Sequence, residues 1–191
     1  MATRKKANKK PGKGLKIALR TFLALILLFI AVVGIGMVNA NTVRVRKAEV
    51  VLPDLPAGFD GTRVLYAADI DLCGLNTAEK SGALFRQLQD LSPDMLILGG
   101  DYSAASLLEI LNRPAGVSGN LSETLAQRSS FFYYIQSFDA PLGKYAIASP
   151  EDGDYQSLSN LMTECGFQPI INAKAEIKLN DASLWLASFS L

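Results

Sequence analysis

Two short apolar segments that end in acidic residues constrain the fold of this chain most strongly. They read VLYAADID over residues 64–71 and MLILGGD over residues 95–101. Short continuous apolar runs bounded by Gly and Asp are typical of strands buried in a parallel sheet, and such sheets bind ligands at the carboxyl ends of their strands. The sequence therefore predicts an α/β fold in which the carboxylates of Asp69, Asp71 and Asp101 converge at one edge of the sheet.

The N-terminal region separates basic from apolar residues. Eight of the 19 basic residues lie in the first 20 positions, which hold no acidic residue, whereas residues 21–191 carry 11 basic and 18 acidic residues. An acidic body argues against nucleic acid as a partner of the folded part. Residues 21–38 form an 18-residue stretch without charge, which reaches the length of a slightly short bilayer-spanning helix.

These patterns predict three parts of the chain. Residues 1–20 form a basic cytoplasmic tail, residues 21–40 a transmembrane anchor, and residues 41–191 an α/β domain. The positive-inside bias keeps the tail in the cytoplasm, so we expect a single-pass protein whose C-terminal domain lies outside the cell membrane. The small residues from Val38 to Ala40 leave a cleavable signal peptide as an alternative to the anchor.

Strands and helices are expected to alternate in the C-terminal domain. Expected strands span residues 43–52, 63–68, 95–98, 144–148, a short stretch near 170, 175–179 and 183–189. Expected helices span residues 77–91, 104–111, 121–138 and 155–165. In the first of them, Leu84, Leu88 and Leu91 share the apolar face, with Phe85 beside them. The first strand, helix and strand of residues 63–98 have the length of a crossover unit with parallel strands. Because the last strand runs almost to residue 191, we expect the domain to be incomplete at its C-terminal end.

Three strand ends carry polar motifs in a fixed order: DID at residues 69–71, GGDY at 99–102 and ASPED at 148–152. With the segments LPDLPAGFDGTRVLYAADIDL, LSPDMLILGGDY, APLGKYAIASPED and CGFQPIINAKAEIKLNDASLWLAS, this order resembles the calcineurin-like metallophosphoesterases, especially their membrane-anchored bacterial branch. The resemblance covers roughly residues 43–189. It implies a layered sandwich of mixed sheet and helices, and a metal-dependent hydrolysis of a phosphoester substrate.

The resemblance also implies metal ligands. The family carries Asp-x-His and Gly-Asp-x-x-Asp at the first two strand ends, and Asp69 and Asp101 match the Asp positions. Two metal ions need a bridging carboxylate, oxygen and imidazole ligands, and a hydroxide aimed at phosphorus. Asp71 stands where the family has His and is the third candidate ligand. Its hard oxygen favours Mn, Mg or Ca over Zn.

The chain departs from the family at the remaining positions. It contains no histidine. Pro150 replaces the ligand Asn of the third motif and has no side-chain donor or acceptor, and Ala104 replaces the second Asp of the second motif. Glu151 stands at the position of the family's catalytic His, and Asp152 keeps the family's acidic position, so these two are the candidate catalytic residues. A carboxylate of normal pKa near 4.3 is ionised at neutral pH and repels phosphate.

Several interpretations therefore remain open at this stage. The chain is expected to be a membrane-anchored phosphoesterase domain in which hydrolysis is impaired or lost, with a divalent metal or none. The main alternative is an inactive membrane-tethered binding or scaffold protein, and a third is a fragment that needs a partner to supply missing strands. Asp69 and Asp101 have a simpler role as turn or capping residues, and Glu151 and Asp152 as acidic groups near a helix N-terminus. The sequence identifies no protein partner.

Overall fold

The computed structural model describes residues 13–40, 43–74, 76–104 and 122–189. The chain forms two compact units, Met1–Val51 and Leu52–Leu191. The helix expected over residues 104–111 lies outside the described residues except for its first residue, and the side chain of Glu151 also lies outside them.

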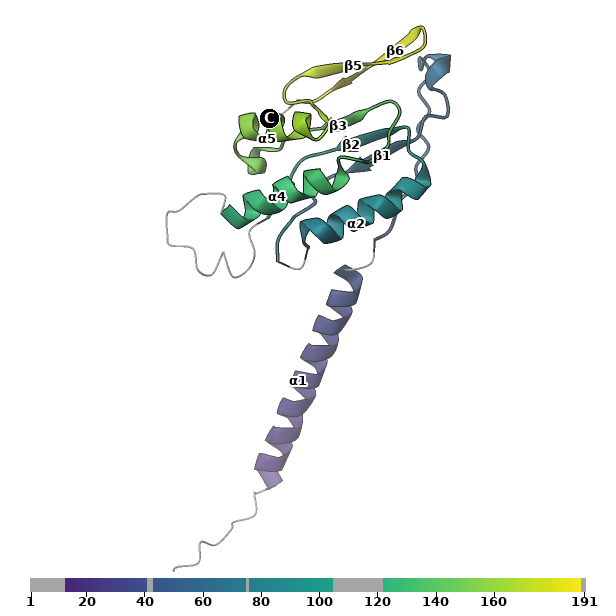
Figure 1. Ribbon diagram of the computed structural model, residues 1–191. Helices are drawn as coiled ribbons and strands as arrows, with labels where there is room; N and C mark the ends of the chain where they lie inside the picture. Colours follow the sequence, from purple (N-terminus) through teal and green to yellow (C-terminus); the bar gives the residue numbers. More distant parts are fainter. Residues whose placement is uncertain (1–12, 41–42, 75, 105–121, 190–191) are drawn as a thin grey trace, which may run out of the picture. The chain divides into compact units, whose positions relative to one another are not determined.

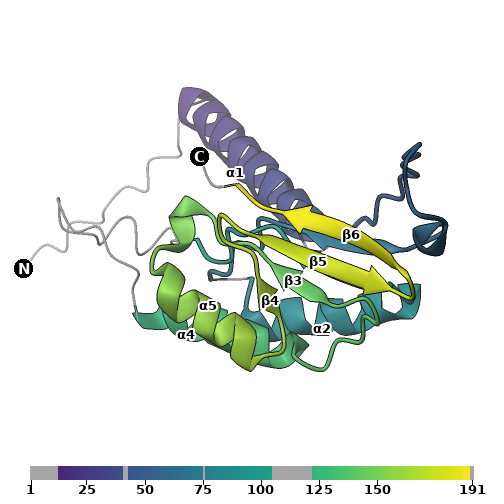
Figure 2. The same cartoon turned by 90° about the horizontal axis from the view of Figure 1, so that it is seen from above.

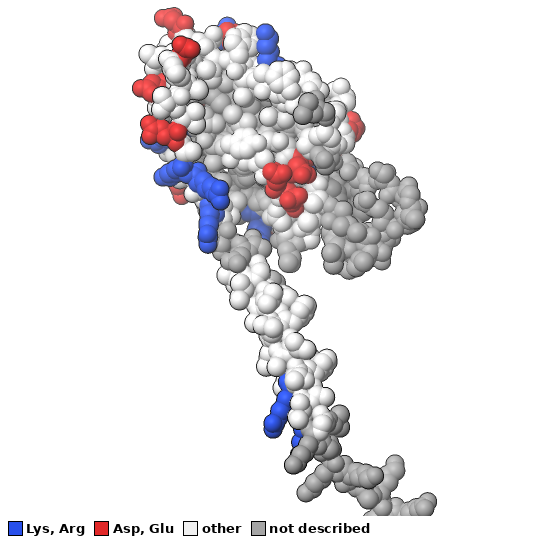
Figure 3. All heavy atoms as spheres, turned by 180° about the vertical axis from the view of Figure 1, so that it is seen from behind, with Lys and Arg blue, Asp and Glu red and all other residues white. Residues whose placement is uncertain are grey.

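The first unit contains one long helix, α1 (Lys13–Ala40). Its described side chains from Lys16 onward are all exposed, and the part from Lys16 to Gly36 is long and apolar enough to cross a membrane. Figure 3 shows an uncharged surface along α1, beyond the basic side chains near its N-terminal end.

The strand expected over residues 43–52 was wrong. This stretch contains no strand, and its Val side chains are exposed. Alternation of Val with Arg fits a half-buried strand, but a strand also needs a hydrogen-bonded neighbour, which these residues do not have in the described part of the chain.

The second unit is built on a four-stranded parallel sheet with the order β1-β2-β3-β4 (Figure 1). The strands are β1 (Val64–Ala67), β2 (Met95–Leu98), β3 (Lys144–Ala146) and β4 (Gln168–Pro169). The parallel pairing of β1 with β2 confirms the expected crossover unit. Both strands are apolar runs that end at residues able to turn the chain.

Helices connect consecutive strands of the sheet. They are α2 (Ala78–Leu88), which continues as the 3-10 turn η2 (Gln89–Leu91), α4 (Ser122–Ile135) and α5 (Tyr155–Glu164). Thr77 caps α2 by accepting a hydrogen bond from the Lys80 backbone N–H at 3.3 Å. This N-cap confirms the predicted start of the helix.

The buried face of α2 agrees only in part with the expected one. Its buried residues are Ala78, Ser81, Gly82 and Phe85. Phe85 was expected there, whereas the three leucines expected beside it, Leu84, Leu88 and Leu91, are only half-buried. A Cβ at Gly82 would lie 2.5 Å from the Cβ of Tyr134. α4 therefore approaches α2 closely at Gly82, and the face of α2 that packs against α4 is centred on this glycine and not on the leucines.

Two apolar clusters lie on opposite faces of the sheet. The larger cluster packs β2 against the helices and includes an edge-to-face contact between Phe85 and Phe131, whose ring centroids are 5.5 Å apart. The smaller cluster packs Met95 and Tyr145 against the turn η1 (Ala57–Phe59) and the antiparallel hairpin of β5 (Lys174–Leu179) and β6 (Ala182–Ala187). Figure 2 shows α2, α4 and α5 along one side of the sheet and the hairpin along the other. The unit is thus a mixed α/β structure with a parallel sheet.

Candidate functional site

Three loops follow the carboxyl ends of neighbouring strands at one edge of the sheet. Residues 68–72 follow β1, residues 99–104 follow β2, and residues 147–152 follow β3 and end in the short 3-10 turn η3 (Pro150–Asp152). All candidate residues of the sequence analysis lie in these loops. Because the strands are parallel and adjacent, the loops share one edge.

Backbone hydrogen bonds join the first two loops. The N–H of Asp69 donates to the Gly100 carbonyl at 3.1 Å, and the N–H of Ile70 donates to the Asp101 carbonyl at 2.9 Å. The N–H of Leu72 also donates to the Tyr102 carbonyl, at 2.9 Å. The backbones at positions 69 and 101 are therefore adjacent.

Asp69, Asp71 and Asp101 share an uncommon backbone conformation. Their φ angles are 53°, 51° and 56°, and they make up half of the six described non-glycine residues with positive φ. Aspartate tolerates this left-handed region better than most side chains, although such residues still store strain of the order of 1 kcal/mol or more.

The side chains of the site do not fit the two-metal centre of the metallophosphoesterases. In the described part of the chain, no group of three or more His, Cys, Asp or Glu side chains could hold a metal ion. Asp69 and Asp71 are exposed and Asp101 is half-buried. The loops bring the three backbones together without gathering the carboxylates, and the role of these residues as metal ligands stays a prediction.

A buried carboxylate ties the third loop to the second. Asp152 is 1% exposed. Its Oδ2 accepts hydrogen bonds from the backbone N–H groups of Ser149 at 2.8 Å and Asp101 at 3.0 Å, and its Oδ1 accepts one from the Tyr102 N–H at 2.9 Å. We call this arrangement the loop clamp. It fixes the backbone at Asp101, so Asp152 acts here as a positioning residue, and a direct catalytic role for it or for Glu151 stays a prediction.

Close backbone approach between the same two loops requires a glycine. Gly100 has φ of 91°, and a Cβ at this position would lie 2.9 Å from the Ser149 backbone nitrogen. Any other residue would push the second and third loops apart.

Sequence reasoning missed two side chains that support the loop clamp. Arg128, on α4, is 4% exposed and donates from Nη1 to the Asp152 carbonyl oxygen at 2.6 Å. Burial lowers the pKa of Arg128, while the charge of Asp152 opposes that shift. Tyr102 is completely buried and donates to the Ile147 carbonyl at 2.6 Å. Burial first, and the charge of Asp152 second, raise the pKa of Tyr102 well above its usual value of about 10.

Only one of these two side chains left a signal in the sequence. Tyr102 directly follows the Asp of the GGDY motif at a strand end, where a functional residue is expected. Arg128 lies inside a helix, 24 residues before the Asp152 carbonyl that it contacts, and nothing local marks it.

The chain is similar to a metallophosphoesterase. The uncharacterized metallophosphoesterase YkuE of Bacillus subtilis (strain 168) is 25% identical to it over 132 residues, which are 68% of this chain and 41% of that protein. The chain therefore spans less than half the length of this relative. No family model and no solved structure matches the chain. The distant similarity agrees with the family indicated by the strand-end motifs.

Proposed function

We propose that this chain is a membrane-anchored, extracytoplasmic domain of metallophosphoesterase type in which phosphoester hydrolysis is impaired. The hydrogen-bonded pairing of the loops at Asp69 and Asp101 carries the proposal, because it joins the two positions that match the family's aspartates. The similarity to a protein named a metallophosphoesterase supports the same family. The apolar part of α1 supports the anchor, and the basic residues that precede it support the orientation.

Impairment follows from the groups that the chain does not supply. General acid catalysis contributes about 10²–10⁴-fold to rate, most often through histidine, and this chain has none. Carboxylates of ordinary pKa are ionised at neutral pH and cannot donate a proton to a leaving group. The family's Asn ligand is replaced by Pro150, which has no side-chain donor or acceptor.

Within this proposal, any remaining metal site takes a single hard divalent ion. Asp69, Asp71 and Asp101 offer oxygen atoms only, which suit Mn, Mg or Ca better than Zn. Such a site requires the three carboxylates to turn toward one another from adjacent backbones. We assign no catalytic step to the ion.

The hydrolysis of bis(p-nitrophenyl) phosphate by the full chain in nanodiscs, with a panel of divalent metals, tests the proposal. We expect turnover at least a hundredfold below the roughly 10 s⁻¹ of a typical enzyme. Any residual rate should fall in Asp101→Asn, which keeps a side chain that tolerates positive φ. The control Asp60→Asn removes an exposed carboxylate that follows η1 and should leave the rate unchanged. Typical turnover, or a residual rate that is insensitive to Asp101→Asn, would overturn the proposal.

Protease treatment of intact spheroplasts tests the membrane part separately. External protease should digest the domain beyond residue 41 and leave the basic tail protected. Digestion only after lysis would place the domain in the cytoplasm and contradict the proposed orientation.

An inactive membrane-tethered binding or scaffold protein is the second candidate. It is favoured by one observation, namely that the described residues form no group of three or more His, Cys, Asp or Glu side chains that could hold a metal ion. This candidate predicts no hydrolysis with any metal and no change in the measured rate on Asp101→Asn.

A further inference from the structure

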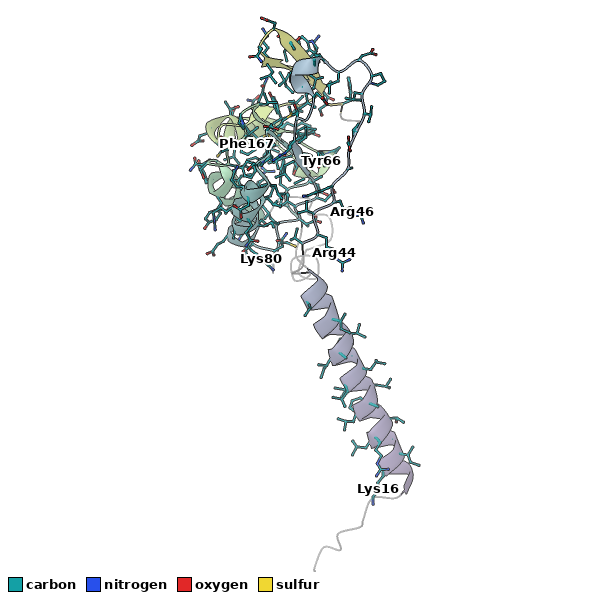
Figure 4. The ribbon with its side chains drawn as sticks, turned by 90° about the vertical axis from the view of Figure 1, so that its right-hand side faces the viewer. Lys16, Arg44, Arg46, Tyr66, Lys80 and Phe167 are labelled. Atoms are coloured by element: carbon teal, nitrogen blue, oxygen red, sulfur yellow. The ribbon has the colours of Figure 1, made fainter. Side chains whose placement is uncertain are left out.

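An amphipathic segment of alternating residues follows α1 in the chain. Residues 43–47 read VRVRK, contain no strand or helix, and are all exposed. In extended backbone, successive side chains point to opposite sides, so the two valines share one side and the two arginines the other. Figure 4 shows Arg44 and Arg46 projecting from the same side of the chain. We call residues 43–47 the juxtamembrane strap.

The strap's cationic groups have no protein partner in the described part of the chain. In the described residues an ion pair joins Lys178 to Glu176, and no described ion pair or side-chain hydrogen bond involves Arg44, Arg46 or Lys47. Glu49, which is exposed and two residues beyond Lys47, is the one acidic residue between α1 and the end of this unit. The strap therefore presents uncompensated positive charge beside exposed apolar side chains.

We propose that the juxtamembrane strap binds the headgroups of anionic phospholipids in the leaflet on the C-terminal side of the membrane. This inference rests on the proposed membrane anchor. The basic side chains would contact lipid phosphates, while Val43 and Val45 lie toward the hydrocarbon boundary, as in other amphipathic interfacial segments.

Chain connectivity keeps the strap near the lipid surface. The uncharged residues 21–38 rise about 27 Å as a helix, close to the roughly 30 Å thickness of the hydrocarbon core, which puts Val38 near its boundary. Ala40 ends α1, and only residues 41 and 42 separate it from the strap. At no more than 3.8 Å per residue, Arg44 lies within about 15 Å of Ala40. Lipid headgroups are consequently present at high effective concentration, whereas a soluble acidic partner would have to be recruited.

Charge complementarity sets the size of the expected effect. Each basic side chain near an anionic surface improves binding by about fivefold. Arg44 and Arg46 together should therefore strengthen binding of the strap to an anionic membrane about 25-fold. This gain should weaken at high salt, because salt screens the headgroup charges.

Tryptophan fluorescence of the full chain in nanodiscs tests the lipid contact. A Val45→Trp probe is placed in a Trp185→Phe background, which removes the chain's only native tryptophan. Brominated acyl chains quench a tryptophan that reaches the hydrocarbon boundary. We expect strong quenching in phosphatidylglycerol and weak quenching in phosphatidylcholine. Arg44→Gln with Arg46→Gln should lower quenching in phosphatidylglycerol to the phosphatidylcholine level.

A matched control removes two exposed basic groups elsewhere, by Arg86→Gln with Lys178→Gln, and should leave quenching unchanged. Equal quenching in the two lipids, or quenching that survives loss of both strap arginines, would overturn the proposal. A blue-shifted probe that no brominated lipid quenches would also overturn it, because the strap would then be covered by protein.

A Leu28→Trp probe in the same background tests the anchor itself. If this probe is not quenched, α1 does not enter the bilayer and both proposals fail. Quenching at position 28 with none at position 45 would reject only the lipid contact.

Discussion

Asparagine at position 152 has the shape of aspartate but presents one oxygen instead of two. In Asp152→Asn, the single amide oxygen can still accept hydrogen bonds from the backbone N–H groups of Ser149 and Asp101. The amide nitrogen then faces the Tyr102 N–H, so two donors oppose each other at about the 2.9 Å of the present hydrogen bond. Losing one charge-assisted hydrogen bond costs roughly 1.5–3 kcal/mol. Weakening the other two from charged to neutral costs about 1 kcal/mol each. The free energy of unfolding should therefore fall by about 4 kcal/mol.

A loss of about 4 kcal/mol is large beside the 5–15 kcal/mol that stabilises a typical domain, and lowers the folding equilibrium constant about a thousandfold. Urea unfolding of the full chain in detergent micelles, followed by circular dichroism, measures it. Hydrogen exchange of the Asp101 and Tyr102 amides should also accelerate in the variant, because the loop clamp protects both.

Asp154→Asn is the matched control for this prediction. Asp154 is exposed, caps α5 and accepts hydrogen bonds from the backbone N–H groups of Gln156 and Ser157. Asparagine is an equally good N-cap, so this change should cost less than about 0.5 kcal/mol. A cost below about 1 kcal/mol for Asp152→Asn, or equal costs for the two variants, would refute the loop clamp.

Three further predictions concern pH dependence, helix packing and helix capping. The raised pKa of Tyr102 means that the stability this group contributes is present below about pH 10 and is lost as the pH rises toward the folded-state pKa. Alkaline unfolding measured by circular dichroism should therefore depend on pH less steeply in Tyr102→Phe, by up to about 1.4 kcal/mol per pH unit, and an unchanged slope would contradict this. Gly82→Ala should lower the free energy of unfolding by about 1–3 kcal/mol, measured in urea, because the new Cβ would lie 2.5 Å from the Cβ of Tyr134. If the variant is instead more stable, through the higher helix propensity of alanine, α2 and α4 separate easily and the prediction is wrong. Thr77→Ala should cost about 1 kcal/mol in the same assay through loss of the α2 cap, and no cost would mean that the cap is dispensable.

The sheet could be predicted because its strands carry local signals. β1 and β2 are continuous apolar runs followed by acidic and glycine residues, and their ends agree with the expected ones to within a residue. The strand predicted over residues 43–52 was wrong, because alternation indicates which side chains share a face but not whether a neighbouring strand is present. The prediction that leucines form the buried face of α2 was wrong because contact with α4 at Gly82 determines which face is buried.

The candidate site was predictable only at the level of the backbone. Strand ends on parallel neighbours meet, so the pairing of the Asp69 and Asp101 loops followed from the motif order. The direction of each carboxylate depends on positive φ angles at single residues, which composition and periodicity do not reveal. The loop clamp joins residues about 50 positions apart through backbone N–H groups, so the sequence suggested only an acidic group near a helix start at Asp152.

Calorimetric titration of Mn²⁺ into the full chain in nanodiscs tests most directly whether the two joined loops form one metal site. We predict that at most one ion binds per chain, with an affinity that falls at least tenfold in Asp69→Asn and in Asp101→Asn and is unchanged in Asp60→Asn. Two ions per chain, or an affinity that ignores both loop substitutions, would contradict a single-ion site.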